Sequence, residues 1–138
     1  MTCRERGSTL LLFPAALLVM VVLAAVTVDL ARVRLGGQQA DALAGAVAND
    51  TVTVGLDPDA LRAGEDYRLD PRRVDTVAAR AERLAGLPDL TVTAEVIGNR
   101  AVAVDVRTTV RLGFAAALPG ARPTVPVRAG ATARAVLR

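Results

Sequence analysis

Carboxylates are the side chains of this sequence whose type and spacing could support acid–base or metal chemistry. The chain contains no histidine, which is the commonest general base and the commonest metal ligand in proteins. Ser8 is the only serine and Cys3 is the only cysteine, so no nucleophile can be paired with an imidazole and no intramolecular disulfide can form. Any reaction would therefore depend on the acidic residues.

The acidic residues suggest two candidate sites. Glu95 and Asp105 would share the exposed face of a predicted hairpin, where a carboxylate pair could exchange protons with a substrate. A second group lies in a predicted loop and consists of Asp57, Asp59, Glu65, Asp66 and Asp70. This group lacks the alternating spacing and the glycine of a calcium loop. We interpret both groups as solvated surface carboxylates and expect no catalytic, cofactor-binding or metal-binding residue.

The charge pattern argues against nucleic acid as a partner. The net charge is only +3, all basic residues are arginine, and acidic residues are interleaved with them along the chain. Aromatic residues, on which bases would stack, make up 2% of the sequence. We therefore expect no nucleic-acid binding.

The stretch from Gly7 to Val28 carries no charged residue and consists mainly of Leu, Val and Ala. As a helix rising 1.5 Å per residue it would span roughly 30 Å, the thickness of one hydrocarbon core. We expect a permanent transmembrane helix over residues 8–28, preceded by a short cytoplasmic segment, residues 1–7. The alternative is a cleaved secretory signal, since the sequence VLAAV offers a small-residue cleavage site after Ala24 or Ala25.

Helical spacing continues beyond this segment and predicts a helical extension over residues 29–49. Small or apolar residues recur three or four positions apart and form a stripe, namely Leu30, Val33, Gly37, Ala40, Ala44 and Val47. The pair Gly36–Gly37 is a weak point at which a kink would be tolerated. Two uses of the stripe stay open: it packs against its own domain, or it docks against other membrane helices.

A helix is predicted over residues 71–85. Asp70 suits the capping position, Pro71 suits the first turn, and Gly86 can end the helix in the left-handed conformation. The expected apolar face consists of Val74, Val77, Ala78, Ala81 and Leu84.

The remaining segments predict a small extracytoplasmic α+β domain over residues 50–138. Residues 51–69 read as a short extended piece followed by a loop. An apolar period of two then indicates a hairpin of strands 90–97 and 101–112 and a last strand within 124–138. The fold class we expect is therefore α+β. A long N-terminal transmembrane helix extends beyond the membrane into one helix packed on a three-stranded antiparallel sheet.

Several short motifs follow one another in a recognisable order. Arg6–Gly7 opens the apolar run, Asp29 follows it, and Gln38 and Asp41 lead into an alanine-rich stretch. A valine-rich hairpin and an alanine-rich last strand close the chain. In this order the chain resembles the TadE/TadG-like proteins of tight-adherence (Flp) pilus assembly.

The resemblance implies a single-pass pseudopilin-like or accessory protein that acts by packing and not by catalysis. It also marks Gly7 and Ser8 as a candidate processing site. Leu12 stands where pilins cut at that position usually carry glutamate, which favours a membrane-resident accessory role.

The expected location is the bacterial cell membrane, with the N-terminus cytoplasmic and the C-terminal domain extracytoplasmic. Arginines are balanced across the apolar run, so this orientation follows from the free N-terminus and not from charge. The expected partners are the lipid bilayer and other membrane or pilus-assembly proteins, with self-association into an oligomer as a further expectation. The alternative function is a secreted or tethered domain that binds an anionic cell-wall polymer through the exposed arginines Arg107, Arg111, Arg128 and Arg134.

Overall fold

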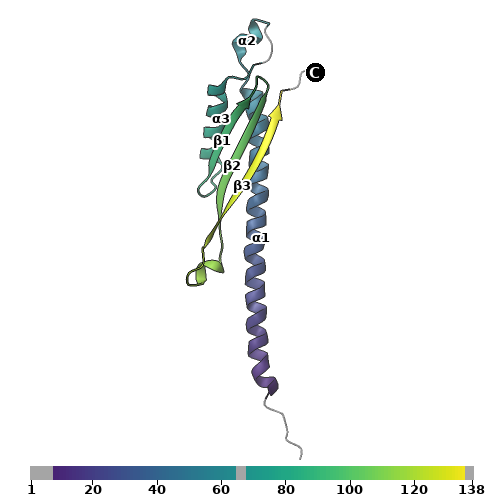
Figure 1. Cartoon of the computed structure of the whole chain (residues 1–138), viewed down its shortest axis with the longest axis vertical. Helices are drawn as coiled ribbons and strands as arrows, with labels where there is room; N and C mark the ends of the chain where they lie inside the picture. The colour runs from purple at the N-terminus through teal and green to yellow at the C-terminus, as the bar shows by residue number, and fades with distance from the viewer. Residues whose placement is uncertain (1–7, 65–67, 136–138) are drawn as a thin grey trace, which may run out of the picture.

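One long helix and a small sheet make up the structure, a computed structural model that describes residues 8–64 and 68–135 (Figure 1). The helices are α1 (Ser8–Val54), α2 (Pro58–Arg62) and α3 (Pro71–Leu84), with a 3₁₀ turn η1 (Ala115–Ala117). The strands are β1 (Thr91–Ile97), β2 (Ala101–Arg111) and β3 (Thr124–Arg134). The expected α+β fold class, with a long apolar N-terminal helix and a three-stranded antiparallel sheet, is confirmed.

Helix α1 has two halves with different surroundings. Its 47 residues correspond to about 70 Å at the standard helical rise. The side chains of residues 12–28 are exposed, apart from the half-buried Ala25. From Asp29 onward one face becomes buried at helical spacing, and its buried residues are Asp29, Gly36, Ala40, Ala44, Val47, Ala48 and Thr51. The first half therefore stands free of the domain except near its end, where Ala24, Ala25 and Val28 share a pocket with Phe114, and the second half belongs to the domain.

One local expectation for this region is wrong. Residues 51–54, expected to be extended, form the last turn of α1. The Thr51 hydroxyl donates a hydrogen bond to the Val47 carbonyl and is fully buried, so tertiary packing outweighs strand propensity here. Helix α1 is continuous through Gly36 and Gly37, the pair at which the sequence would tolerate a kink.

The sheet has the order β1-β2-β3 with both pairs antiparallel. Val102, Val104 and Val106 of the central strand are buried and alternate with more exposed residues, as the period of two predicts. Pro126 lies on β3, an edge strand that, among the described strands, pairs only with β2. Proline, which has no backbone N–H, is tolerated on such a strand.

Helix α3 begins and ends at the predicted signals. The Asp70 carboxylate accepts the backbone N–H of Arg72 at 3.0 Å, Pro71 occupies the first turn, and Gly86 has φ +61°. Val74 and Ala78 are buried. Leu84, predicted to share this face, is instead 72% exposed at the end of the helix.

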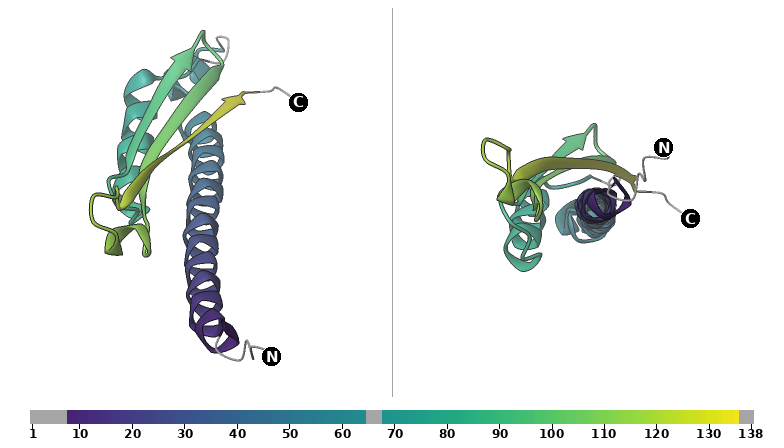
Figure 2. Two further views of the ribbon diagram at one scale, coloured as in Figure 1. Left: turned by 60° about the horizontal axis from the view of Figure 1, so that its bottom comes forward. Right: turned by 90° about the horizontal axis from the view of Figure 1, so that it is seen from below.

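Both helices cover the same face of the sheet (Figure 2). Helix α1 packs against β2 and β3, and α3 packs against β1 and α1. One core joins them, because Ala40, Ala44 and Val47 from α1 belong to the same cluster of buried residues as the valines of the sheet. The expected domain boundary at residue 50 therefore falls inside α1, and the 29–49 extension supplies part of the core.

Candidate functional site

Asp29 fixes the β2–β3 loop to helix α1. It is the first charged residue after the apolar run, and its carboxylate faces the loop between β2 and β3. Its carboxylate accepts backbone N–H groups from Gly113 at 2.7 Å, Phe114 at 2.9 Å and Ala115 at 3.1 Å. These donors open the 3₁₀ turn η1, so a side chain of one element caps the start of another. We call this arrangement the Asp29 junction.

The electrostatics of the Asp29 junction keep the carboxylate ionised. Asp29 is only 8% exposed, and this burial by itself raises the pKa of its carboxyl group. The three backbone hydrogen bonds and the nearby Arg32, whose Nη1 lies 3.9 Å from Oδ1, outweigh burial and lower the pKa of Asp29 below its usual value. The ionised carboxylate of Asp29 therefore accepts the three backbone N–H groups at neutral pH.

The predicted helix-packing stripe is only partly buried. Ala40, Ala44 and Val47 lie in the core of the domain, and Val33 and Gly37 are half-buried. Leu30 is 69% exposed and does not belong to this face. The described stripe thus packs against its own sheet, which was one of the two uses left open. Gly36 and Ala48, which the spacing argument missed, complete the buried face.

Gln38 and Asp41, the other two positions on which the family resemblance rests, do not form a site with Asp29. Both are exposed on α1, whereas Asp29 is buried. Ser8 is the first residue of α1, and Gly7 lies outside the described residues. The Asp29 contacts had one sequence signal, the aspartate that ends an uncharged run, but nothing in the sequence identified the loop that binds it.

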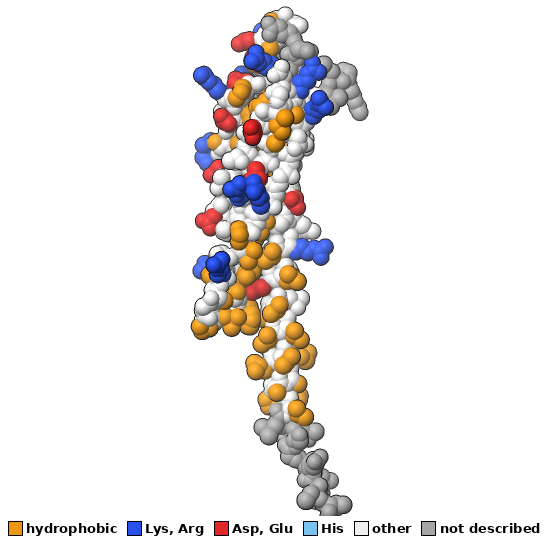
Figure 3. All heavy atoms as spheres, viewed as in Figure 1, with side chains coloured by type: hydrophobic (Ala, Val, Ile, Leu, Met, Phe, Trp, Pro, Cys, Tyr) orange, Lys and Arg blue, Asp and Glu red, His pale blue; other side chains and the backbone are white. Residues whose placement is uncertain are grey.

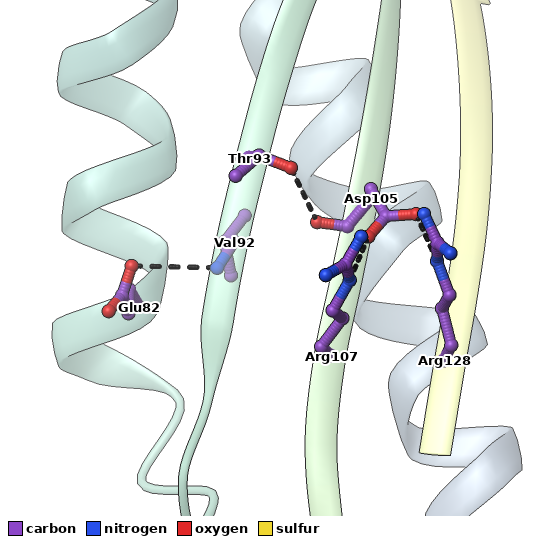
Figure 4. Close-up of polar contacts among 6 residues, drawn as sticks. All are labelled: Glu82, Val92, Thr93, Asp105, Arg107 and Arg128. Atoms are coloured by element: carbon purple, nitrogen blue, oxygen red, sulfur yellow. Dashed lines mark hydrogen bonds and ion pairs between the residues drawn. The ribbon is translucent and has the colours of Figure 1, made fainter. Parts of the chain in front are cut away.

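The polar face of the sheet is built around Asp105 (Figure 4). Its two carboxylate oxygens accept hydrogen bonds from Arg107 Nε at 3.0 Å and Arg128 Nε at 2.7 Å. The bond from Arg128 is the main cause that lowers the pKa of Asp105; partial burial opposes it, and Arg107 adds to the lowering. Arg111 and Arg134 are exposed on the same two strands. Two of the four arginines proposed to bind an anionic polymer are thus already paired.

Glu95 lies diagonally across the β1–β2 ladder from Asp105. Because Asp105 is occupied by two guanidinium groups, the pair has the character of a surface charge cluster more than that of an acid–base dyad. Among residues 8–64 and 68–135, no three Asp, Glu or Cys side chains gather as a metal site would require. Of the predicted loop group, Glu65 and Asp66 lie outside the described residues.

Apolar side chains gather on the exposed half of α1 and at the end of the domain nearest to it (Figure 3). In the part of the chain that the structure describes, α1 is the one helix long and apolar enough to cross a membrane, and none of its most apolar stretch is buried. No known protein family, curated protein or solved structure matches the chain. The arrangement can hold a small domain in a fixed orientation relative to an apolar helix.

Proposed function

We propose that the chain is a non-catalytic single-pass membrane protein of the pseudopilin-like or accessory kind, acting in a Tad/Flp-type pilus or a related secretion assembly. The continuous helix α1 is the observation that carries this proposal. Its first half offers an apolar surface to lipid and to other helices, and its second half is locked into the domain. Such a protein acts through helix packing and protein–protein contacts, and its partners would be other membrane or assembly proteins.

The membrane half of α1 is well suited to contacts with other helices. It exposes small residues such as Ala24 beside large ones such as Leu17, Leu18 and Val21. In lipid, helix association depends on close van der Waals packing, which small residues permit. We infer that assembly contacts are made by this half, because the stripe of the second half is used within the domain.

Wall-polymer binding is the less supported function. Its proposed face includes Arg107 and Arg128, whose charges are offset by Asp105. Arg111 and Arg134 are exposed, and neither belongs to an ion pair among the described residues. Reversing these two charges separates the two functions. If the intact protein does not bind the wall, or if it still binds after the reversal, the assembly role stands; if the reversal abolishes wall binding, the alternative is supported.

The test of the proposed role combines the mature mass with a deletion phenotype. The intact mass is measured from membrane and culture-supernatant fractions, and surface filaments and secreted filament subunits are compared in cells with and without the gene. A full-length chain in the membrane, or one that begins at Ser8, together with filament loss restored by the intact gene, supports the role. A secreted chain beginning near Ala25, or normal filaments after deletion, refutes it.

A further inference from the structure

The β2–β3 loop carries an apolar tip that the domain itself does not cover. Residues 112–121 contain no side chain with a polar group. Phe114 is half-buried, and Leu118 remains 46% exposed. Loops that cross an aqueous surface are normally polar, with turn residues between charged or hydroxyl side chains. This loop has the turn residues but lacks the polar ones, so its surroundings need an explanation.

The loop lies where the apolar half of α1 ends. The Asp29 junction attaches it to the residue that follows the uncharged run. Within the five residues that precede Asp29, Ala24 and Val28 line an open pocket together with Phe114 and Ala117. Phe114 and Ala117 therefore lie alongside the last turn of the predicted transmembrane segment. The loop forms the end of the domain that points toward this segment (Figure 1).

Arginines flank the apolar tip. Arg111 and Arg122 stand at its two ends in the sequence, and Arg32 on α1 lies beside Gly113; all three are exposed. An apolar tip bordered by guanidinium groups matches the boundary of a bilayer, where acyl chains meet phosphate headgroups.

We propose that residues 112–121 form a second membrane contact, inserted into the headgroup region of the leaflet on the domain side. The proposal rests on the membrane-spanning helix of the proposed function and is independent of the pilus role. Apolar groups that bind at an interface typically enter it by about 5–10 Å. The pocket shared by the loop and α1 reaches from Asp29 back to Ala24, about 7 Å along the helix axis, which falls within that depth. With two contacts, the domain is held against rotation and tilt relative to the bilayer surface.

Tryptophan fluorescence tests this contact directly, since the chain has no tryptophan of its own. Three single variants of the full chain are reconstituted into phosphatidylethanolamine–phosphatidylglycerol vesicles, with or without acyl-brominated phosphatidylcholine as quencher. Leu118→Trp reports on the loop, Val21→Trp on the membrane helix, and Ile97→Trp on the opposite end of the sheet. Ile97 is 53% exposed, so the matched control replaces a similarly exposed apolar side chain and carries the same intrinsic affinity of tryptophan for interfaces.

The expected result is a blue-shifted emission and a clear loss of intensity in brominated vesicles for Leu118→Trp, approaching that of Val21→Trp. Ile97→Trp should show neither effect. Quenching of Val21→Trp without quenching of Leu118→Trp overturns the loop contact alone. Absence of quenching in both overturns the membrane-spanning helix as well. Phe114→Trp, an aromatic-for-aromatic replacement, gives the same readout if the Leu118 variant does not fold.

Discussion

Gly36 and Gly37 are neighbours on α1 with opposite expectations for replacement by alanine. A Cβ atom added at Gly36 would collide with Cγ2 of Val110 on β2, whereas one added at Gly37 meets no atom within 4 Å. Both replacements gain the same helix propensity, about 1 kcal/mol relative to glycine. Crowding a packed site costs about 1–3 kcal/mol, and the stiff χ1 of valine limits relaxation. Gly36→Ala should therefore be less stable than Gly37→Ala by about 1–3 kcal/mol.

The difference can be measured on the full chain in detergent micelles by pulse proteolysis across a urea series. Gly37→Ala should unfold at the same or higher urea concentration than the parent chain, and Gly36→Ala at a lower concentration than Gly37→Ala. A double-mutant cycle with Val110→Ala adds a specific check, because removing the obstructing methyl groups should reduce the cost of Gly36→Ala.

Equal stability of the two glycine variants would refute the close seating of α1 on β2. So would a cost at Gly36 that is unchanged in the Val110→Ala background, since the cost would then not arise from this contact. Either result would mean that the helix lies further from the sheet than described.

Three further perturbations have defined outcomes. Asp29→Asn removes the charge that accepts three backbone N–H groups, so hydrogen exchange should accelerate across residues 113–121, and unchanged exchange would refute the Asp29 junction. The pKa of Asp105 is lowered in the folded state from 3.8, so its stabilisation is present at neutral pH and is lost as the pH falls below about 4. Asp105→Asn should accordingly lower the free energy of unfolding by up to about 1 kcal/mol near pH 7 and have little effect near pH 2, as urea titrations at the two pH values would reveal. Val106→Ala empties part of the core and should cost about 2–3 kcal/mol in the same assay, whereas the exposed Leu84→Ala should change stability by less than about 0.5 kcal/mol.

Local signals predicted most of the elements. The hairpin, the last strand and helix α3 each had a clear period or capping residue, such as Asp70, and these elements lie where the sequence placed them. The turn at Thr51 could not be predicted, because its β-branched neighbours favour a strand and only burial against the domain keeps it helical. Local propensity carries no information about such tertiary contacts.

The candidate site was less accessible to sequence reasoning than the fold. Asp29 was singled out by its place after the uncharged run and by the family resemblance, but its partner loop is separated from it by 84 residues. The stripe was found by its spacing, but the choice between self-packing and docking depended on which side the sheet would occupy. For that reason Leu30 was wrongly included in the stripe and Gly36 was left out of it. A spacing of three or four allows two adjacent faces, and only the position of β2 selects one of them.

Helix α1 and strand β3 pack against each other although they lie far apart in the sequence, and this has a consequence for biogenesis. Helix α1 is synthesised first, but its inner face stays uncovered until β2 and β3 arrive, and β3 ends only at Arg134. Contacts of such long sequence separation form slowly, because a large loop must close before they contribute. The growing chain therefore holds an incomplete core until β3 has been synthesised. A variant truncated before β3 should accumulate as an unfolded, protease-sensitive chain and not as a smaller folded domain.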